Sequence, residues 1–354
     1  MWAARCAYAG ARGVSTRDRP DTVGIPESNL RSSGSVPMKS PKTARKMWIA
    51  AGITLGALII VSGLIVQPSL IRRVPFTLPE ASLDTWEAIL SNPRPISVRT
   101  FSTGTMKTDL SGILNLEHPA ATDIEDTPVD LPVNVSIVRH AERGAYLVDG
   151  GLDASYVHNP FGTMRGLIVE RFLGKGSQEP GQDTASLLDR EQAAIQGVFL
   201  THLHMDHTAG LVDLPKDIPY VVGENERYVN FRFIIQGDHL AGVPELQEIA
   251  FDKGVDLAPL GTAVDLFGDG SFWAIRSPGH SAGHVLYFVN GVEEQVLLTG
   301  DACNTLEQFS TGIGPGFYSS DVAQAQASMD RIIRFKNQHP QVALSFGHDQ
   351  AMLR

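Results

Sequence analysis

The chain has 354 residues, enough for one large domain and an appendage, and its 43% hydrophobic and 19% charged residues are typical of a globular protein. The net charge of −10 is unevenly spread, because residues 1–47 hold nine Lys or Arg against three Asp or Glu, which leaves 20 against 36 for the rest. A body of about −16 argues against nucleic acid as a partner, since phosphate binding needs clustered basic residues.

The N-terminal part reads as a leader followed by a membrane anchor. Residues 1–46 are rich in Arg, Ser, Gly and Pro, which predicts a disordered basic leader. Residues 1–37 are either an upstream extension absent from the natural product or an organelle targeting peptide. Met47–Ile71 has no charged residue and is long enough to span a bilayer, so we predict one transmembrane helix; a cleaved signal peptide and a buried core helix are the alternatives. The basic excess before it favours a single-pass membrane protein with its body on the non-cytoplasmic (periplasmic or extracellular) side.

The remaining chain mixes strands and helices. Residues 72–95 are expected to be a linker with a short helix at Leu83–Leu90, and residues 96–354 the folded domain. Apolar runs and alternation predict strands at Ile96–Phe101, Val133–Val138, Ala145–Val148, Gly197–Leu200, Ile218–Val222, Phe272–Arg276, Val285–Val289, Val296–Leu298 and Val342–Leu344. Helical spacing predicts helices at Thr184–Gln196, capped by Asp183 or Thr184, at Glu224–Phe231 and at Asp321–Lys336. The acidic, Pro-rich segment Glu117–Pro132 is expected to be a surface loop.

The most informative feature is the sequence T-H-L-H-M-D-H at Thr201–His207. Alternation along an extended segment sends His202, His204 and Asp206 to one side, and His207 can turn towards the same point. Imidazole and carboxylate groups at this density are the ligands of a divalent transition metal. Three further candidate ligands stand at the ends of predicted strands: His280, Asp301 and His348.

These seven positions, H-x-H-x-D-H…H…D…H, resemble the metallo-β-lactamase-fold hydrolases over residues 96–354. The resemblance implies an α/β fold, the αββα four-layer sandwich. It implies that one metal ion is held by His202, His204 and His280, that a second is held by Asp206, His207 and His348, and that Asp301 bridges the two. Zn²⁺ is the expected metal, with manganese or iron as alternatives.

The resemblance also implies a chemistry. Two cations about 4 Å apart can share a hydroxide that serves as the nucleophile, so no side-chain nucleophile is needed. The candidate catalytic residues are Asp206 and Asp301, either of which could pass a proton to the leaving group of a small-molecule substrate.

Details of the motif favour one branch of this family. Gly347-His348-Asp349 and the run P-G-H-S-A-G-H at Pro278–His284 are most similar to the N-acyl homoserine lactonase branch, which implies ester or lactone hydrolysis. β-Lactamases with a thiolate ligand carry Cys where Asp301 stands, which argues against a β-lactam substrate. A thioester or phosphodiester hydrolase of the same fold is the alternative, and a non-enzymatic metal-binding protein a third. The branch has Tyr where Asn304 stands, and Tyr318 is the candidate substitute.

The other histidines and cysteines are expected to play structural parts. Cys6 lies in the leader, so the body can form no internal disulfide, and Cys303 is expected to be a small packed residue. His284 is expected to be structural rather than a ligand. The histidines expected on the surface or in loops are His118, His140, His158, His239 and His339.

Overall fold

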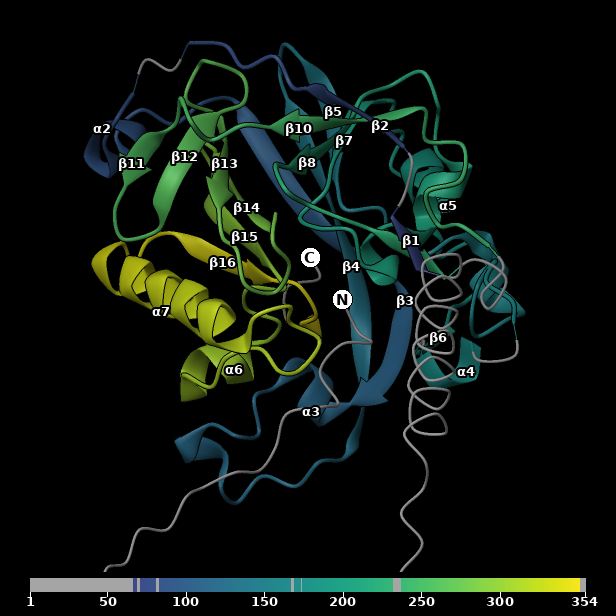
Figure 1. Cartoon of the computed structure of the whole chain (residues 1–354). Helices are drawn as coiled ribbons and strands as arrows, with labels where there is room; N and C mark the ends of the chain where they lie inside the picture. Colours follow the sequence, from purple (N-terminus) through teal and green to yellow (C-terminus); the bar gives the residue numbers. More distant parts are fainter. Residues whose placement is uncertain are drawn as a thin grey trace, which may run out of the picture. The chain divides into compact units, whose positions relative to one another are not determined.

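Two β-sheets pack face to face at the centre of the fold (Figure 1). The computed structural model describes residues 66–68, 71–80, 83–166, 169–172, 174–231 and 237–350. The larger sheet has eight strands in the order β2 (Arg72–Pro75), β10 (Glu245–Ile249), β8 (Tyr220–Gly223), β7 (Ile195–Phe199), β5 (Gly144–Val148), β4 (Pro128–His140), β3 (Ile96–Asp109) and β6 (Lys175–Ser177). The smaller sheet has six, in the order β11 (Val255–Leu257), β12 (Gly261–Asp265), β13 (Phe272–Arg276), β14 (Val285–Asn290), β15 (Gln295–Gly300) and β16 (Ala343–Phe346).

Apolar side chains from both sheets meet between them. The ring of Phe199 on β7 packs edge-on against Phe272 on β13, with centroids 5.2 Å apart, and Phe272 stacks on Tyr287 of β14 at 5.5 Å. Every residue of β14 is buried, because one face of this strand looks into the sandwich and the other lies under a helix. Burial on both faces explains why the sequence of β14 is continuously apolar rather than alternating.

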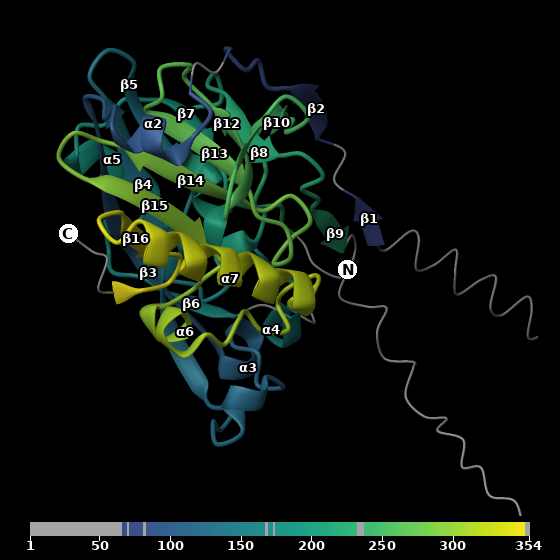
Figure 2. The ribbon, with the colours of Figure 1, turned by 90° about the vertical axis from the view of Figure 1, so that its left-hand side faces the viewer.

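Helices cover the outer face of each sheet. α7 (Val322–Gln338) packs Met329, Ile332 and Phe335, at helical spacing, into the same apolar cluster as the outer face of the six-stranded sheet. α2 (Trp86–Leu90) joins this cluster, while α5 (Thr184–Arg190) packs with the eight-stranded sheet. Figure 1 shows α7 and α5 on opposite sides of the paired sheets, and α7 faces the viewer in Figure 2. The αββα four-layer sandwich is thereby confirmed.

Short elements complete the described part. The helices are α3 (Leu110–Ile113), α4 (Val169–Phe172) and α6 (Leu306–Thr311), and the 3-10 turns are η1 (Pro119–Ala121), η2 (Ala154–Val157), η3 (Met205–His207) and η4 (Ala209–Asp213). A two-stranded sheet pairs β1 (Val66–Pro68) with β9 (Val229–Phe231).

The predicted strands are confirmed, but β3 and β4 extend beyond their predicted bounds. Their antiparallel ladder runs from the Ile96–His140 pair to the Asp109–Pro128 pair, with a bulge between Ser102 and Thr105. Residues 128–132 therefore belong to β4, and only the earlier part of the expected surface loop is a loop. The bulge contains Gly104 at φ 141°, a conformation open to glycine, and it lets the ladder continue past the Ser-Thr-Gly break in the pattern.

Three helix predictions have different outcomes. The helix at Asp321–Lys336 is confirmed as α7. α5 is shorter than predicted and ends at Arg190, with the side chain of Asp183 capping its start by accepting from the amide of Ser186. The helix at Glu224–Phe231 is wrong, because Asn225 has φ 66°, which a right-handed helix does not allow, and the segment leads into β9.

The segment expected to be a linker contributes to the fold. Arg72–Pro75 forms β2, which pairs in parallel with β10, and Arg73 Nη1 lies 2.7 Å from Glu248 Oε1 across this pair. These four residues are therefore a strand rather than a linker, and the expected short helix is α2, which begins after its cap at Thr85.

Most of the N-terminal prediction lies outside the described residues. The leader and nearly all of the expected anchor at Met47–Ile71 fall there. Only the end of the anchor segment is described, and there Val66–Pro68 forms β1, so the predicted helix does not extend to Ile71. Across the described ranges, no helix combines the length and apolar character that a membrane span requires.

Candidate metal centre

Seven polar side chains converge in loops that follow the strands of both sheets. His202 and His204 follow β7, Asp206 and His207 lie on η3, His280 stands between β13 and β14, Asp301 follows β15, and His348 follows β16. β15 and β16 are parallel neighbours, so their ends bring Asp301 and His348 to the same edge. All seven predicted residues are therefore brought together.

The first cluster consists of three imidazoles and one carboxylate. His280 Nε2 lies 3.2 Å from His202 Nε2 and 2.9 Å from His204 Nδ1. Oδ2 of Asp301 lies 3.3 Å from His280 Nε2. Potential ligand atoms of these four residues all lie within 4.8 Å of one another, so they could hold one metal ion.

The second cluster consists of Asp206, His207 and His348. Oδ2 of Asp206 lies 3.5 Å from His348 Nε2 and 3.8 Å from His207 Nε2. Strand alternation accounts for His202 and His204, but the 3-10 turn η3 rotates Asp206 away from them and groups it with His207. The single motif thus supplies both clusters.

Asp301 faces both clusters with different oxygens. Its Oδ1 lies 3.2 Å from His207 Nε2 and 3.3 Å from His348 Nε2, whereas its Oδ2 faces His280. A carboxylate in this position can bridge two cations.

The donor set fits metal ions better than it fits internal hydrogen bonding. His207 Nε2 and Asp301 Oδ1 are buried and make no hydrogen bond with each other or with another described group, although buried polar atoms are normally paired. The ring nitrogens of three histidines also point at one another within the first cluster. Cations between these atoms would satisfy the lone pairs that the protein leaves unmatched.

Burial and charge set the protonation of these groups. Burial lowers the pKa of both His202 and His280 well below the usual range, which keeps these imidazoles in the neutral form that binds metal. Burial alone would lower the pKa of His207, but the carboxylates of Asp301 and Asp149 raise it well above its usual value. Burial alone would raise the pKa of Asp301, but the surrounding histidines lower it well below its usual value.

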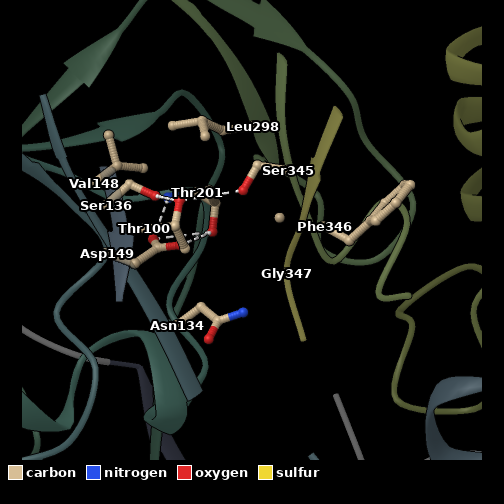
Figure 3. Close-up of a pocket in the computed structure, with 11 residues that line it drawn as sticks. Thr100, Asn134, Ser136, Val148, Asp149, Thr201, Leu298, Ser345, Phe346 and Gly347 are labelled. Carbon is tan, nitrogen blue, oxygen red and sulfur yellow. Dashed lines mark hydrogen bonds between the residues drawn. The ribbon is translucent and has the colours of Figure 1, made fainter. Parts of the chain in front are cut away.

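Hydrogen bonds behind the second cluster orient its rings. Asp149, at the end of β5, accepts at Oδ2 from His207 Nδ1 at 2.9 Å and at Oδ1 from the amide of Thr201 at 2.7 Å. His348 Nδ1 donates to the carbonyl of Pro132 at 2.8 Å. The two bonds that start from Nδ1 fix the Nδ1–H tautomer of His207 and His348 and leave Nε2 of each ring available to a metal. Figure 3 shows Asp149 and Thr201 joined by hydrogen bonds, close to Thr100, Ser136 and Ser345. These residues line a cavity of about 20 Å³.

Two glycines allow the ligand loops to approach. A Cβ on Gly347 would lie 2.7 Å from Asp301 Oδ1, so a side chain there would displace the carboxylate. Gly300 has φ 48° and lies against His284 and Thr201, so the chain can turn sharply just before Asp301.

Several neighbours behave as predicted. His284 is buried and its Nε2 accepts from the amide of Asp301 at 3.1 Å, which makes it a structural support. Cys303 is buried and belongs to the apolar cluster beneath the six-stranded sheet.

Asn304 and Tyr318, the two residues considered for contact with a substrate, differ in their surroundings. Asn304 is only 1% exposed and its Nδ2 donates to the carbonyl of Ile113 at 3.3 Å, so the side chain is enclosed rather than presented to a substrate. Tyr318 is half-buried with its hydroxyl against that of Thr108, and the next residue, Ser319, lies with Oγ 3.5 Å from His280 Nδ1. The loop that carries Tyr318 therefore flanks the first cluster.

The prediction of a surface or loop position is wrong for His140, which is buried at the end of β4, and holds only in part for His239, which lies in a loop but is buried. His140 is buried with Nε2 3.0 Å from Asp269 Oδ2, and His239 is buried against the ring of Tyr228 at 4.2 Å. Tertiary packing covers both, and no local pattern reveals it. Asp149 was not among the predicted site residues, and its only signal in the sequence is an acidic residue before Gly150-Gly151 at the end of an apolar strand.

The sequence of the chain is similar to that of a known superfamily and to those of several N-acyl homoserine lactonases. The sequence model of the Metallo-beta-lactamase superfamily matches residues 128–348, which is 221 of the 354 residues. An N-acyl homoserine lactonase, AttM from Agrobacterium fabrum, is 26% identical over 226 residues, which cover 62% of this chain and 82% of that protein. AttM from Rhizobium johnstonii is 28% identical over 198 residues, which cover 54% and 73%.

Among solved structures, a variant of B. thuringiensis AiiA with N-decanoyl-L-homoserine bound at its active site has a TM-score of 0.55 and 21% identity, covering 73% of this chain and 95% of that one. An N-acyl homoserine lactone hydrolase with the product N-hexanoyl-L-homoserine bound at its catalytic metal centre has the same TM-score, identity and coverage. At this identity the likeness is one of fold.

Proposed function

Since the chain belongs to the metallo-beta-lactamase superfamily, we propose that it is a dinuclear metal-dependent hydrolase that cleaves a lactone or another ester. The observation that carries the dinuclear part is the position of Asp301, whose two oxygens face different clusters. The lactonase relatives support the choice of bond.

His202, His204 and His280 would hold one ion, Asp206, His207 and His348 the other, and Asp301 would bridge them. Two Zn²⁺ ions bound there would supply a hydroxide nucleophile at neutral pH and would polarise the scissile carbonyl. No side-chain nucleophile is required of the chain.

The two carboxylates have different parts in this proposal. The side chain of Asp301 is 6% exposed and the neighbouring histidines hold its pKa well below normal, so it stays charged as a bridge. The side chain of Asp206 is 22% exposed, which leaves it open to the leaving group of a substrate. Asp206 is therefore the residue that would pass a proton to the leaving oxygen.

Tyr318 is the residue that we propose contacts the substrate. Asn304 is enclosed and cannot reach a substrate, whereas the loop of Tyr318 flanks His280. The phenol of Tyr318 would donate a hydrogen bond to the substrate carbonyl or leaving oxygen.

A substrate panel tests the function. The purified chain should hydrolyse N-acyl homoserine lactones or simple esters, lose this activity to a chelator and regain it with Zn²⁺, and leave β-lactams intact. Hydrolysis confined to thioesters or phosphodiesters would refute the choice of bond but keep the metal centre. Full activity in a metal-free preparation would refute the whole proposal.

We also propose that residues 47–65, the part of the predicted anchor that precedes β1, hold the protein in a membrane with its body on the non-cytoplasmic side. The support is compositional: the segment carries no charge and basic residues precede it.

A further inference from the structure

One buried carboxylate joins the two loops that carry the first cluster. Glu226 lies in the turn after β8 and is 1% exposed. Its Oε1 accepts from the amide of Leu203 at 3.1 Å, and its Oε2 accepts from the amide of Gly283 at 3.0 Å and from the hydroxyl of Ser281. The first bond is made to the loop that carries His202 and His204, and the other two are made to the loop that carries His280.

The donors are placed next to the candidate ligands. Leu203 stands between His202 and His204, and Ser281 follows His280 directly. Gly283 precedes His284, which accepts from the amide of Asp301. The hydrogen bonds of the Glu226 carboxylate to described residues go to these loops and not to the coordinating rings, so we expect its effect on a metal ion to pass through the two loops.

The turn that presents Glu226 is tightly fixed. Asn225 takes the left-handed conformation at φ 66°, and the amide of Glu226 donates to the carbonyl of Gly223 at 3.2 Å. Gly283 packs directly on this turn, because a Cβ there would lie 2.3 Å from the nitrogen of Glu226. The carboxylate is thus held by a rigid backbone rather than by a flexible segment.

Burying the Glu226 carboxylate costs free energy, because the charged form loses its hydration. Its described partners are two amides and one hydroxyl, all neutral, and burial raises the pKa of Glu226 to about 6 in spite of them. An apolar side chain of similar size would fill the space but leave two buried amides unpaired. A carboxylate is the side chain that can accept from both loops at once.

We propose that Glu226 is a positioning residue for the first metal site, where it sets the separation between the His202–His204 loop and the His280 loop. This inference rests on the proposed function, because it requires a metal at that site. None of its three donors adjoins Asp206, His207 or His348, so the second site should be independent of Glu226.

The test is a Zn²⁺ titration of the full-length chain against a competing chromophoric chelator, analysed for two sites. Glu226→Gln keeps the shape but turns one oxygen into an amide nitrogen that faces a donor, so at least one of the loop contacts is lost. The affinity of the first site should fall by about 10- to 100-fold, as for other residues that orient metal ligands, while the second site is unchanged. Co²⁺ absorption spectra identify which site has weakened.

Two further variants sharpen the comparison. Glu224→Gln is the matched control, since Glu224 is two residues away, partly exposed and 4.0 Å from Arg276, and it should leave both sites intact. Ser281→Ala removes one of the three hydrogen bonds and should weaken the first site less than Glu226→Gln does. If Glu226→Gln does not fold, a preferential loss at the first site in Ser281→Ala supports the proposal, and no preferential loss overturns it.

The outcomes separate this proposal from the function itself. Unchanged affinity in Glu226→Gln, or an equal loss at both sites, would overturn the positioning role even if the protein melts at a lower temperature. A wild-type chain that binds no metal would overturn both the positioning role and the proposed function.

Discussion

The substitution Asp149→Asn tests how the second metal site is prepared. Asp149 has φ 63°, a conformation that Asn also tolerates, so the exchange leaves the backbone largely undisturbed. The amide oxygen of Asn can still accept from the amide of Thr201, as Oδ1 of Asp149 does at 2.7 Å. Its NH₂ group then replaces the oxygen that accepts from His207 Nδ1.

The size of the effect follows from the tautomer of His207. To avoid two donors facing each other, the imidazole must move its proton from Nδ1 to Nε2, the atom that faces Asp301 Oδ1 at 3.2 Å. A protonated Nε2 cannot bind a metal. We expect the affinity of the second site to fall by about 10- to 100-fold, the range for such orienting partners. This corresponds to about 1.4 to 2.7 kcal/mol.

The assay is the same two-site Zn²⁺ titration, with Glu226→Gln as the complementary variant. Asp149→Asn should weaken the second site and spare the first, whereas Glu226→Gln should do the reverse. Equal affinity of Asp149→Asn and wild type at the second site would refute the argument from the tautomer.

Four further results are expected. Asp301→Ala should lower both metal occupancies and hydrolysis by orders of magnitude, which metal analysis and turnover on one preparation would check; retained stoichiometry would contradict the bridge. Tyr318→Phe should reduce lactone turnover without loss of metal, and an unchanged kcat would remove Tyr318 from the substrate site. In metal-free protein, burial raises the pKa of Glu226 from 4.5 to about 6, so the folded state binds this proton more tightly than the unfolded state does. The resulting contribution to the free energy of unfolding is complete below pH 4.5, and about 2 kcal/mol of it is lost as the pH rises from 4.5 through 6. Urea unfolding of wild type and Glu226→Gln between pH 4.5 and 7 should show this loss only in wild type. The full-length chain should sediment with membranes and be released by detergent but not by salt, and recovery of uncleaved soluble chain would argue against the anchor.

The sequence predicted the site better than its surroundings. The metal-binding residues could be identified because their chemistry is concentrated in a short motif and because each remaining candidate follows an apolar strand. α7 was predictable from its apolar spacing, and β14 from its continuous apolar run. The groups that orient the ligands were not predictable: Glu226 fell in a segment whose composition suggested a helix, and only the left-handed turn at Asn225 brings it inward.

The errors share a physical cause. Pro128 and Pro132 suggested a loop, yet both lie in β4, opposite Asp109 and Thr105 of β3 and outside the stretch of β4 that pairs with β5. His140 and His239 are buried by segments distant in sequence, which local polarity cannot reveal. Features that depend on long-range packing are those that the sequence alone could not supply.

In the proposed function, Asp301 would link two metal ions that are both needed for hydrolysis. The most direct measurement is the metal content of the purified full-length chain, determined by mass spectrometry on the same sample whose N-acyl homoserine lactone hydrolysis is measured during stepwise chelation. We expect about two ions per chain and a hydrolytic activity that falls as they are removed. A preparation that retains full activity with no bound metal would contradict it.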